Sequence, residues 1–437
     1  MNFRAILKHL LLILILLYVF TISTLRIYNA YNEQGLPLIG WDTYHYLAFG
    51  LCFYRAPIDY VLTYSALPRI PDIINGAVEI MLPPQIAFPL ISLNGILLNT
   101  ILLIYIYTKI RHSKEEYDIY IVLLLTLIPI YYVDLQRFYW YLFFFYFAFY
   151  YALARNSLKR SIVLYFLGTV LTYHEIFLIF ILTTIYLIVL AVFKFSHLVS
   201  RVEKYIYNFF VIILIIYLIF FIYKHNLYNS TIFLMFAIYY VLSIVPVLLY
   251  LYLKKAYTYG IVIMLLSLPF IYVGWIHRVS HAIVLFFYMF LPYLKYKRVL
   301  ISINLYKLML FIFALAFTLL HAYLMTTPYY LNTYRHWFTS SDVSFASSLA
   351  SYINDNVSTR HILFLYDYDY YGRDIIFFEL VRYFSNCKFY YYIYKLDSLQ
   401  TNMPQNINNI TYIYIDLKSK TFTVLSQEDF LNQIKTS

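Results

Sequence analysis

The chain has 437 residues, of which 63% are hydrophobic and only 12% are charged, and its formal net charge is +11. A water-soluble globule of this size needs more polar residues to cover its surface. The composition therefore excludes an ordinary soluble protein and predicts a multi-spanning integral membrane protein.

Long apolar stretches follow one another through the first three quarters of the chain. Most are roughly 16–25 residues long, which is near the length that crosses ~30 Å of hydrocarbon as a helix. We place them approximately at 5–25, 84–108, 118–133, 138–154, 161–173, 176–193, 206–223, 232–253, 258–274, 279–294 and 304–324. The sequence thus predicts a polytopic α-helical membrane protein with about 11 transmembrane helices.

Basic residues gather in every second connection between these stretches. Loops rich in Lys and Arg stay on the cytoplasmic side, because translocation of cations is disfavoured. The clusters are Arg4 and Lys8; Lys109, Arg111 and Lys114; Arg155, Lys159 and Arg160; Lys194, Arg201 and Lys204; Lys254 and Lys255; Lys295, Lys297 and Arg298. The alternation predicts a multi-pass protein of the cell membrane with a cytoplasmic N-terminus and an extracytoplasmic C-terminal domain.

Residues 161–193 allow two interpretations: one long helix with His174 and Glu175 in its middle, or two helices that meet at these residues. A single helix would reverse every later loop and move the basic clusters after 254 and 295 to the outside. The alternation therefore favours two helices, the first ending near Thr172 and Tyr173.

Composition divides the chain into a transmembrane domain over 1–325 and a domain over 326–437. From Thr339 onward Asp, Asn and Ser become common and the long apolar runs end. The patterns predict helices over 342–354, starting at Ser340-Ser341-Asp342, over 373–385, and over 426–435 with a Ser426 cap; they predict strands over 361–366, 389–394 and 411–416. A small α/β domain outside the membrane is expected.

The two cysteines, Cys52 and Cys387, both fall on segments predicted to be external. A single disulfide is compatible with that placement, although their spacing in the sequence does not determine whether they lie close together.

Unusual polar residues gather on the predicted outer face. The first external loop, 26–83, is too long to be a simple connector, and such loops are usually functional. It holds Asp42 and His45, and the other outer connections hold Arg137, His174, Glu175, His277 and Arg278. An acid beside arginines suits a site in which Asp42 acts as a general base and Arg137 or Arg278 grips a phosphate through two hydrogen bonds.

The chain resembles the GT-C superfamily of membrane glycosyltransferases, which includes protein O-mannosyltransferases and aminoarabinose transferases. The match lies in Gly40-Trp41-Asp42-Thr43-Tyr44-His45-Tyr46, Leu82-Pro83-Pro84, the His174-Glu175 break, and His277-Arg278, with an external C-terminal domain extending it over the whole length. The resemblance implies a polyprenyl-phosphate-linked sugar donor, a protein, glycan or lipid acceptor, and Asp42 as the catalytic base. Thr43 follows Asp42 where the family often has a second acid, which leaves dependence on a divalent metal open.

Each candidate has a simpler structural interpretation. Asp42 would cap a helix that begins at Thr43, and His174 and Glu175 would cap a span end. Arg137 and Arg278 would reach lipid phosphates without selecting a substrate, and His45 would make a loop hydrogen bond. His277 and His281 have metal-ligand spacing but no third ligand, so no metal site is predicted.

Other classes of protein fit less well. A zinc intramembrane protease needs His-Glu-x-x-His, and Leu178 replaces its second histidine. A transporter usually shows repeats and Gly- or Pro-broken helices, whereas this chain has only 9 Gly. A non-catalytic membrane subunit or receptor that binds a partner through the external domain remains the main alternative. Anionic headgroups of membrane lipids would attract the basic clusters of the cytoplasmic loops, so the positive charge does not require a nucleic-acid partner, and none is expected.

Overall fold

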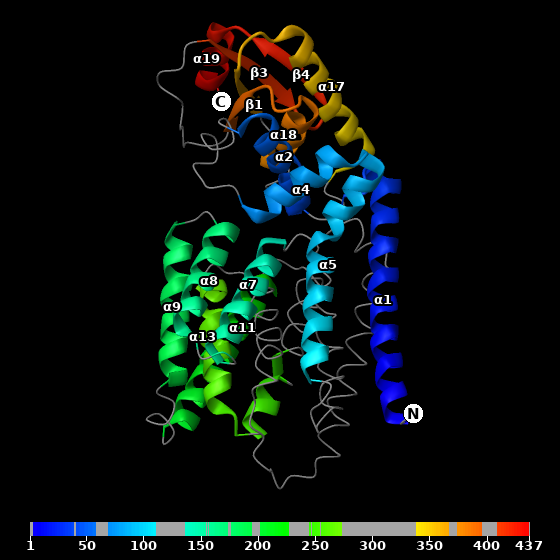
Figure 1. Cartoon of the computed structure of the whole chain (residues 1–437). Coiled ribbons are helices and arrows are strands. Elements are labelled where there is room, and N and C mark those ends of the chain that lie inside the picture. Colours follow the sequence, from blue (N-terminus) through cyan, green and yellow to red (C-terminus); the bar gives the residue numbers. More distant parts are fainter. Residues whose placement is uncertain are drawn as a thin grey trace. The chain divides into compact units, whose positions relative to one another are not determined.

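The computed structural model describes residues 3–38, 41–57, 69–110, 136–153, 155, 157–173, 176–194, 202–226, 244–245, 247–253, 255–272, 338–366, 374–395 and 409–436 (Figure 1). The chain divides into two compact units. The helical unit comprises 1–22, 96–132 and 138–325, and the disulfide-linked unit comprises 23–95, 133–137 and 326–437. Each unit is described below by itself.

Most of the apolar stretches that the structure describes are helical, as predicted. They form α1 (Phe3–Gln34), α5 (Pro84–Ile110), α7 (Gln136–Leu153), α8 (Leu158–Thr172), α9 (Ile176–Lys194), α11 (Glu203–Asn226) and α13 (Tyr257–Tyr272). The predicted helices at 118–133, 279–294 and 304–324, and most of the one at 232–253, lie outside the described residues.

Among the described residues, no helix combines the length and the apolar character needed to cross a membrane.

The division of 161–193 into two helices is confirmed. α8 ends at Thr172, and the Tyr173 amide donates to the Thr169 carbonyl at 2.9 Å in the cap position. A new helix, α9, starts at Ile176. His174 and Glu175, which were predicted to lie at this break, are outside the described residues.

Tyrosine hydroxyls occupy the interior of the helical unit. Tyr141 of α7 and Tyr165 of α8 are joined by a hydrogen bond of 2.8 Å, and Tyr165 donates to the Leu182 carbonyl of α9 at 2.9 Å. The rings of Tyr165 and Tyr186 stack with centroids 3.9 Å apart. Gly168 allows the close approach of α7, because a Cβ there would lie 2.2 Å from the Phe144 Cβ. The hydroxyls of Tyr141 and Tyr165 therefore point inward and are hydrogen-bonded, as burial requires.

The predicted external loop 26–83 is largely helical where the structure describes it. α1 continues to Gln34, and α2 (Trp41–Arg55) and α4 (Ile70–Met81) follow. α2 and α4 cross with their backbones in contact at Gly50 and Gly76, since a Cβ on Gly76 would lie 2.2 Å from the Gly50 carbonyl oxygen. This contact makes α2 and α4 a closely packed helix pair.

The C-terminal part is an α/β domain, and its predicted elements are confirmed. Helices α17 (Ser340–Asn356), α18 (Asp374–Phe384) and α19 (Gln427–Thr436) accompany strands β1 (His361–Tyr366), β2 (Tyr390–Lys395) and β3 (Ile410–Asp416). β4 (Thr421–Leu425) was not predicted. The strand order is β2-β1-β3-β4, with β1 parallel to β2 and β3, and β4 antiparallel to β3.

Helix caps fix the ends of two of these helices. α17 starts at Ser340, as predicted, and Thr339 is its N-cap. The Thr339 hydroxyl accepts from the Asp342 amide, while the Asp342 carboxylate accepts from the Thr339 amide. Ser426 caps α19 as predicted, accepting from the Asp429 amide at 3.1 Å. Such caps satisfy amides that the helix itself leaves without partners.

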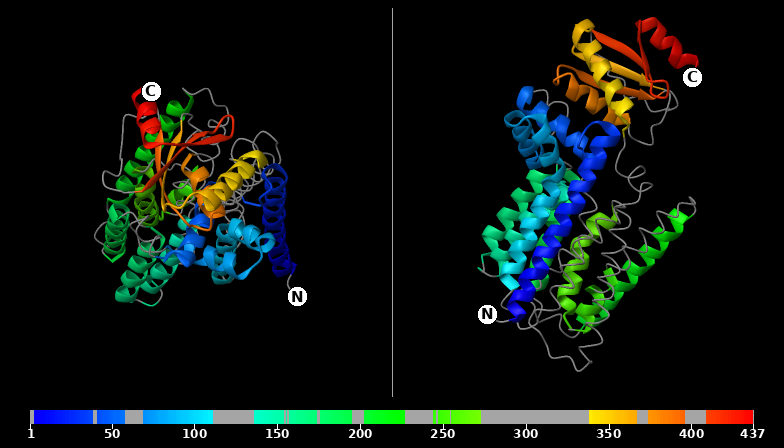
Figure 2. Two further views of the ribbon diagram at one scale, coloured as in Figure 1. Left: turned by 90° about the horizontal axis from the view of Figure 1, so that it is seen from above. Right: turned by 90° about the vertical axis from the view of Figure 1, so that its right-hand side faces the viewer.

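The two faces of the sheet are covered differently (Figure 2). Ile362 and Phe364 of β1 pack with residues of α17 and α18, and the same core includes Tyr44 of α2 and Phe88 of α5. Leu363 and Leu365 face the other way and pack against Phe430 of α19. The core of the disulfide-linked unit is therefore continuous from the α/β domain to the helices near α2.

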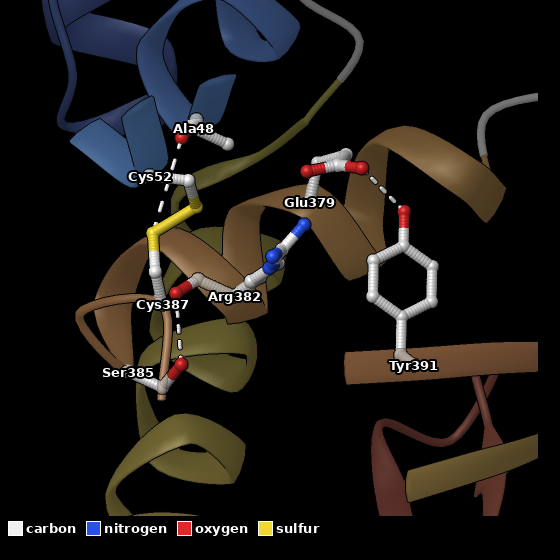
Figure 3. Close-up of a disulfide and its surroundings, with 7 residues drawn as sticks. All are labelled: Ala48, Cys52, Glu379, Arg382, Ser385, Cys387 and Tyr391. Carbon is white, nitrogen blue, oxygen red and sulfur yellow. Dashed lines mark hydrogen bonds between the residues drawn. A yellow bond between two sulfur atoms is a disulfide. The ribbon is translucent and has the colours of Figure 1, made fainter. Parts of the chain in front are cut away.

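A disulfide joins Cys52 of α2 to Cys387, just after α18 (Figure 3). Both cysteines are buried, and 335 residues of sequence separate them. The sequence left open whether these two cysteines are bonded, and the structure contains the disulfide. It ties α2 covalently to the C-terminal α/β domain.

Candidate functional site

Asp42, the predicted base, lies in the first turn of α2, because this helix begins at Trp41. The interpretation of Asp42 as the cap of a helix that begins at Thr43 is therefore wrong, because the helix begins two residues earlier, at Trp41. The residues after it anchor the helix: Thr43, Tyr44, Tyr46 and Leu47 are buried.

Arg69 and Asp72 form a buried ion pair at the start of α4. The Arg69 Nε donates to Asp72 Oδ2 at 2.7 Å and an Nη donates to Oδ1 at 3.1 Å, a two-point contact that only arginine can make. Arg69 is 5% exposed and Asp72 is fully buried. Burial lowers the pKa of Arg69, but Asp72 more than offsets this and the pKa is raised, so the guanidinium stays charged.

The same guanidinium links α4 to α2. The Arg69 Cζ lies 4.8 Å from the centroid of the Phe49 ring and 5.7 Å from that of Tyr46, both within the range of cation–π attraction. Tyr46 and Phe49 follow Asp42 along α2 by one and about two helical turns. Arg69 therefore fixes the helix that carries Asp42.

Arg137 lies in the first turn of α7 and belongs to the disulfide-linked unit, whereas α7 from residue 138 onward belongs to the helical unit. Its positive charge lowers the pKa of Arg69, which means that the two guanidinium groups lie near each other. Arg137 is half-buried, so this repulsion is only partly screened by water. Asp72 pairs with Arg69, so this pair carries little net charge, and Arg137 adds a positive charge near it.

His45 belongs to the same neighbourhood. Its ring centroid lies 5.2 Å from that of Phe49, the residue that Arg69 covers. The ring of His45 thus packs near Phe49, which Arg69 covers, and the charge of Arg137 acts on Arg69. His45 and Arg137, two of the predicted site residues, come from segments far apart in the sequence. His174, Glu175, His277 and Arg278 lie outside the described residues, as does the side chain of Asp42.

Sequence reasoning assigned no role to Arg69, Asp72 or Glu79 beyond their place in the external loop. Arg69-x-x-Asp72 spacing around Pro71 at the start of a helix is the signal that was available. Within the described ranges, no cluster of three or more metal-ligating side chains occurs. His277 and His281 are not among those residues.

A second group of ionisable residues lies at the other end of α2. Glu79 of α4 is half-buried, and burial raises the pKa of its carboxyl to about 8, while Tyr383 and Arg55 lower it by less. Burial also raises the pKa of Tyr383, with the nearby Glu79 adding to the effect.

Comparison with known proteins adds no family. No protein-family model matches this chain, and no curated protein shows significant similarity to it.

Proposed function

We propose that the protein is a polytopic membrane glycosyltransferase that moves a sugar from a polyprenyl-phosphate-linked donor to an acceptor at the outer membrane face. Asp42 is the general base, and Arg137 and Arg278 hold the donor phosphate. His45, His174, Glu175 and His277 line the same site. The proposal extends the resemblance to GT-C enzymes.

The observation that carries the proposal is the neighbourhood formed by α2, α4 and the start of α7. It holds Arg69 and Arg137 near each other, and Arg69 packs on the helix whose first turn contains Asp42. A phosphate needs cations, and a transfer to a hydroxyl or amine needs a base nearby. The proposal assigns the phosphate to Arg137 and Arg278, and the proton transfer to Asp42.

Exposed apolar side chains support the membrane location. Phe180 of α9 is 68% exposed and Ile216 of α11 is 60% exposed, and many other large apolar residues of α1, α5, α8, α9 and α11 are also exposed. Surfaces of this kind are rare on soluble monomers and suit contact with lipid.

A groove in the disulfide-linked unit suits the lipid part of the donor. Its volume is about 560 Å³, and residues of α1 and α5 form its sides, including Tyr28, Tyr31, Phe88 and Pro89. An isoprenoid chain is apolar and flexible, so it would bind here through contact with these rings.

In the proposed reaction Asp42 takes the proton of the acceptor hydroxyl or amine. The acceptor atom then forms a bond to the anomeric carbon, the bond from this carbon to the phosphate oxygen breaks, and polyprenyl phosphate leaves with the electron pair. Direct displacement inverts the anomeric carbon. Arg137 and Arg278 would stabilise the negative charge that grows on the departing phosphate.

The test is binding of the purified protein in lipid nanodiscs to polyprenyl phosphate, compared with ordinary anionic phospholipid. We expect selective binding that Arg137→Ala and Arg278→Ala each weaken at least tenfold. Arg160→Ala, on a predicted cytoplasmic loop, is the matched control and should change nothing. Equal binding of both lipids would contradict the proposal and favour a partner-binding subunit or a transporter.

A further inference from the structure

Glu79 lies far from the proposed catalytic end of α2. It faces Arg55, the last residue of this helix, which comes 13 residues after Asp42. At 1.5 Å per residue the two ends of α2 are about 20 Å apart. A role for Glu79 must therefore be sought where α2, α4 and α18 meet.

The Glu79 carboxylate is enclosed at this junction. Both of its oxygens are buried and have no hydrogen bond of good geometry within the described part of the chain, although the Tyr383 hydroxyl of α18 faces them. On α2, the charged residue that acts on Glu79 is Arg55. On α5, the residue at this junction is the uncharged Phe88, whose ring centroid lies 6.1 Å from that of Tyr383. Burial favours the neutral carboxyl at this site, because Tyr383 and Arg55 stabilise the carboxylate by less than the loss of water destabilises it.

The disulfide lies beside the same contact. Tyr383 packs with Phe49 and Phe53 against the buried Cys52 and Cys387. The turn that carries Cys387 is held by amide hydrogen bonds from Asn386 to the Tyr383 carbonyl, at 2.9 Å, and from Cys387 to the Arg382 carbonyl, at 3.0 Å. Separation of α18 from α2 would therefore expose the disulfide without releasing the chain.

We propose that Glu79, Tyr383 and Arg55 form a proton-dependent latch between the first external segment and the C-terminal domain. With Glu79 neutral, α18 stays packed on α2 and α4. Ionisation of Glu79 loosens α18, and the disulfide keeps it tethered. The latch does not depend on the proposed glycosyltransferase activity.

The direction of the pH effect follows from the carboxyl. In the closed state its pKa is about 8, and in an open, hydrated state it returns to the ordinary value near 4.5. The closed state thus holds its proton more tightly, so closure is fully favoured at low pH and weakens as the pH rises from about 4.5 to about 8. Linkage limits the change in the closing equilibrium to about tenfold per pH unit in this window.

Reduction of the buried disulfide reports the opening of the latch. The full chain in nanodiscs is treated with a phosphine reductant between pH 5 and 9, and each rate is divided by the rate for oxidised glutathione at the same pH. We expect the corrected rate of the wild type to rise at least tenfold across this range. Glu79→Gln should remove the rise, while Glu428→Gln, an exposed carboxylate of α19, should keep it.

Tyr383→Phe provides a second and independent measurement. The Tyr383 hydroxyl lowers the pKa of Glu79, so its removal should move the midpoint of the rise to higher pH. Identical pH profiles for the wild type and Glu79→Gln would overturn the latch. An unchanged midpoint in Tyr383→Phe would overturn it as well, even if Glu79→Gln failed to fold.

Discussion

The helical unit and the α/β domain of the disulfide-linked unit differ in the side chains that they expose. In the helical unit, Tyr141, Ser161 and Tyr165 are buried and hydrogen-bonded, while Phe180 and Ile216 are exposed. The core of the α/β domain is mainly apolar, although Glu379, Arg382 and Ser385 are also buried, and α19 presents Gln427, Glu428 and Asp429 to the outside. The first arrangement suits lipid and the second suits water. In the proposed membrane location, each unit would therefore expose side chains that match its own solvent.

The largest expected effect concerns the unit that we place in water, because the proposed chemistry occurs there. Asp42→Asn should lower the release of polyprenyl phosphate from a lipid-linked sugar donor by about 10²–10⁴-fold, since the acceptor would keep its proton. Asp429→Asn, on exposed α19, is the control. Turnover that survives in a folded Asp42→Asn protein would remove Asp42 from the mechanism.

Loss of the disulfide should strongly weaken the disulfide-linked unit. Cys52→Ser removes a crosslink between residues 335 positions apart, and such losses typically cost about 2–5 kcal/mol. Chemical unfolding followed by the fluorescence of tyrosine and tryptophan measures the cost. Cys387→Ser should give the same value, and the double variant should cost no more than either single one. A loss below about 0.5 kcal/mol would show that packing alone holds α18 on α2.

Replacement of a partly exposed leucine by aspartate should cost more free energy in the helical unit than in the α/β domain. Leu187 lies near the middle of α9 and is 45% exposed, and Leu431 of α19 is 43% exposed. Leu187→Asp should cost about 3 kcal/mol of membrane insertion, because a carboxylate at the centre of a bilayer is unfavourable. Leu431→Asp should change stability by less than about 0.5 kcal/mol. The yield of folded protein in membranes measures both effects. Equal losses for Leu187→Asp and Leu431→Asp would contradict the placement of one unit in lipid and the other in water.

The smallest effect concerns the turn after α18. Asn386 is exposed and has φ 57°, a left-handed conformation that glycine adopts without strain. Asn386→Gly should leave stability unchanged or raise it by a few tenths of a kcal/mol, whereas Asn386→Ala should lower it by about 1 kcal/mol. Thermal unfolding distinguishes the two. A loss on Asn386→Gly would mean that the asparagine side chain itself holds the turn.

Local patterns in the sequence predicted the types of most described elements. The strand over 361–366 follows from a short-range signal, a β-rich run, whereas the break at Tyr173 follows from the alternation of basic loops along the whole chain. β4 was missed because it is only five residues long and follows β3 closely through a tight turn, in which the Asp416 carboxylate accepts from the Lys418 and Ser419 amides.

Contacts between distant segments could not be predicted in the same way. Nothing in the spacing of Cys52 and Cys387 indicates that they meet, and the nearness of Arg137 to Arg69 depends on how α7 begins beside α4. The Arg69–Asp72 pair was hidden for a different reason, because 26–83 was treated as a loop and no helix face was assigned to it. The sequence predicts that the candidate residues lie on one side of the membrane, and tertiary packing determines which of them lie together.

The most direct test of the contrast between the units is the accessibility of spin labels in the reconstituted protein. Single labels at Ile216→Cys, on α11, and Leu431→Cys, on α19, are exposed to oxygen, which concentrates in lipid, and to a water-soluble nickel complex. We predict that the label at 216 responds to oxygen and is shielded from nickel, and that the label at 431 responds mainly to nickel. Equal nickel accessibility at both positions would contradict the placement of the helical unit in the membrane and, with it, the proposed site at the outer face.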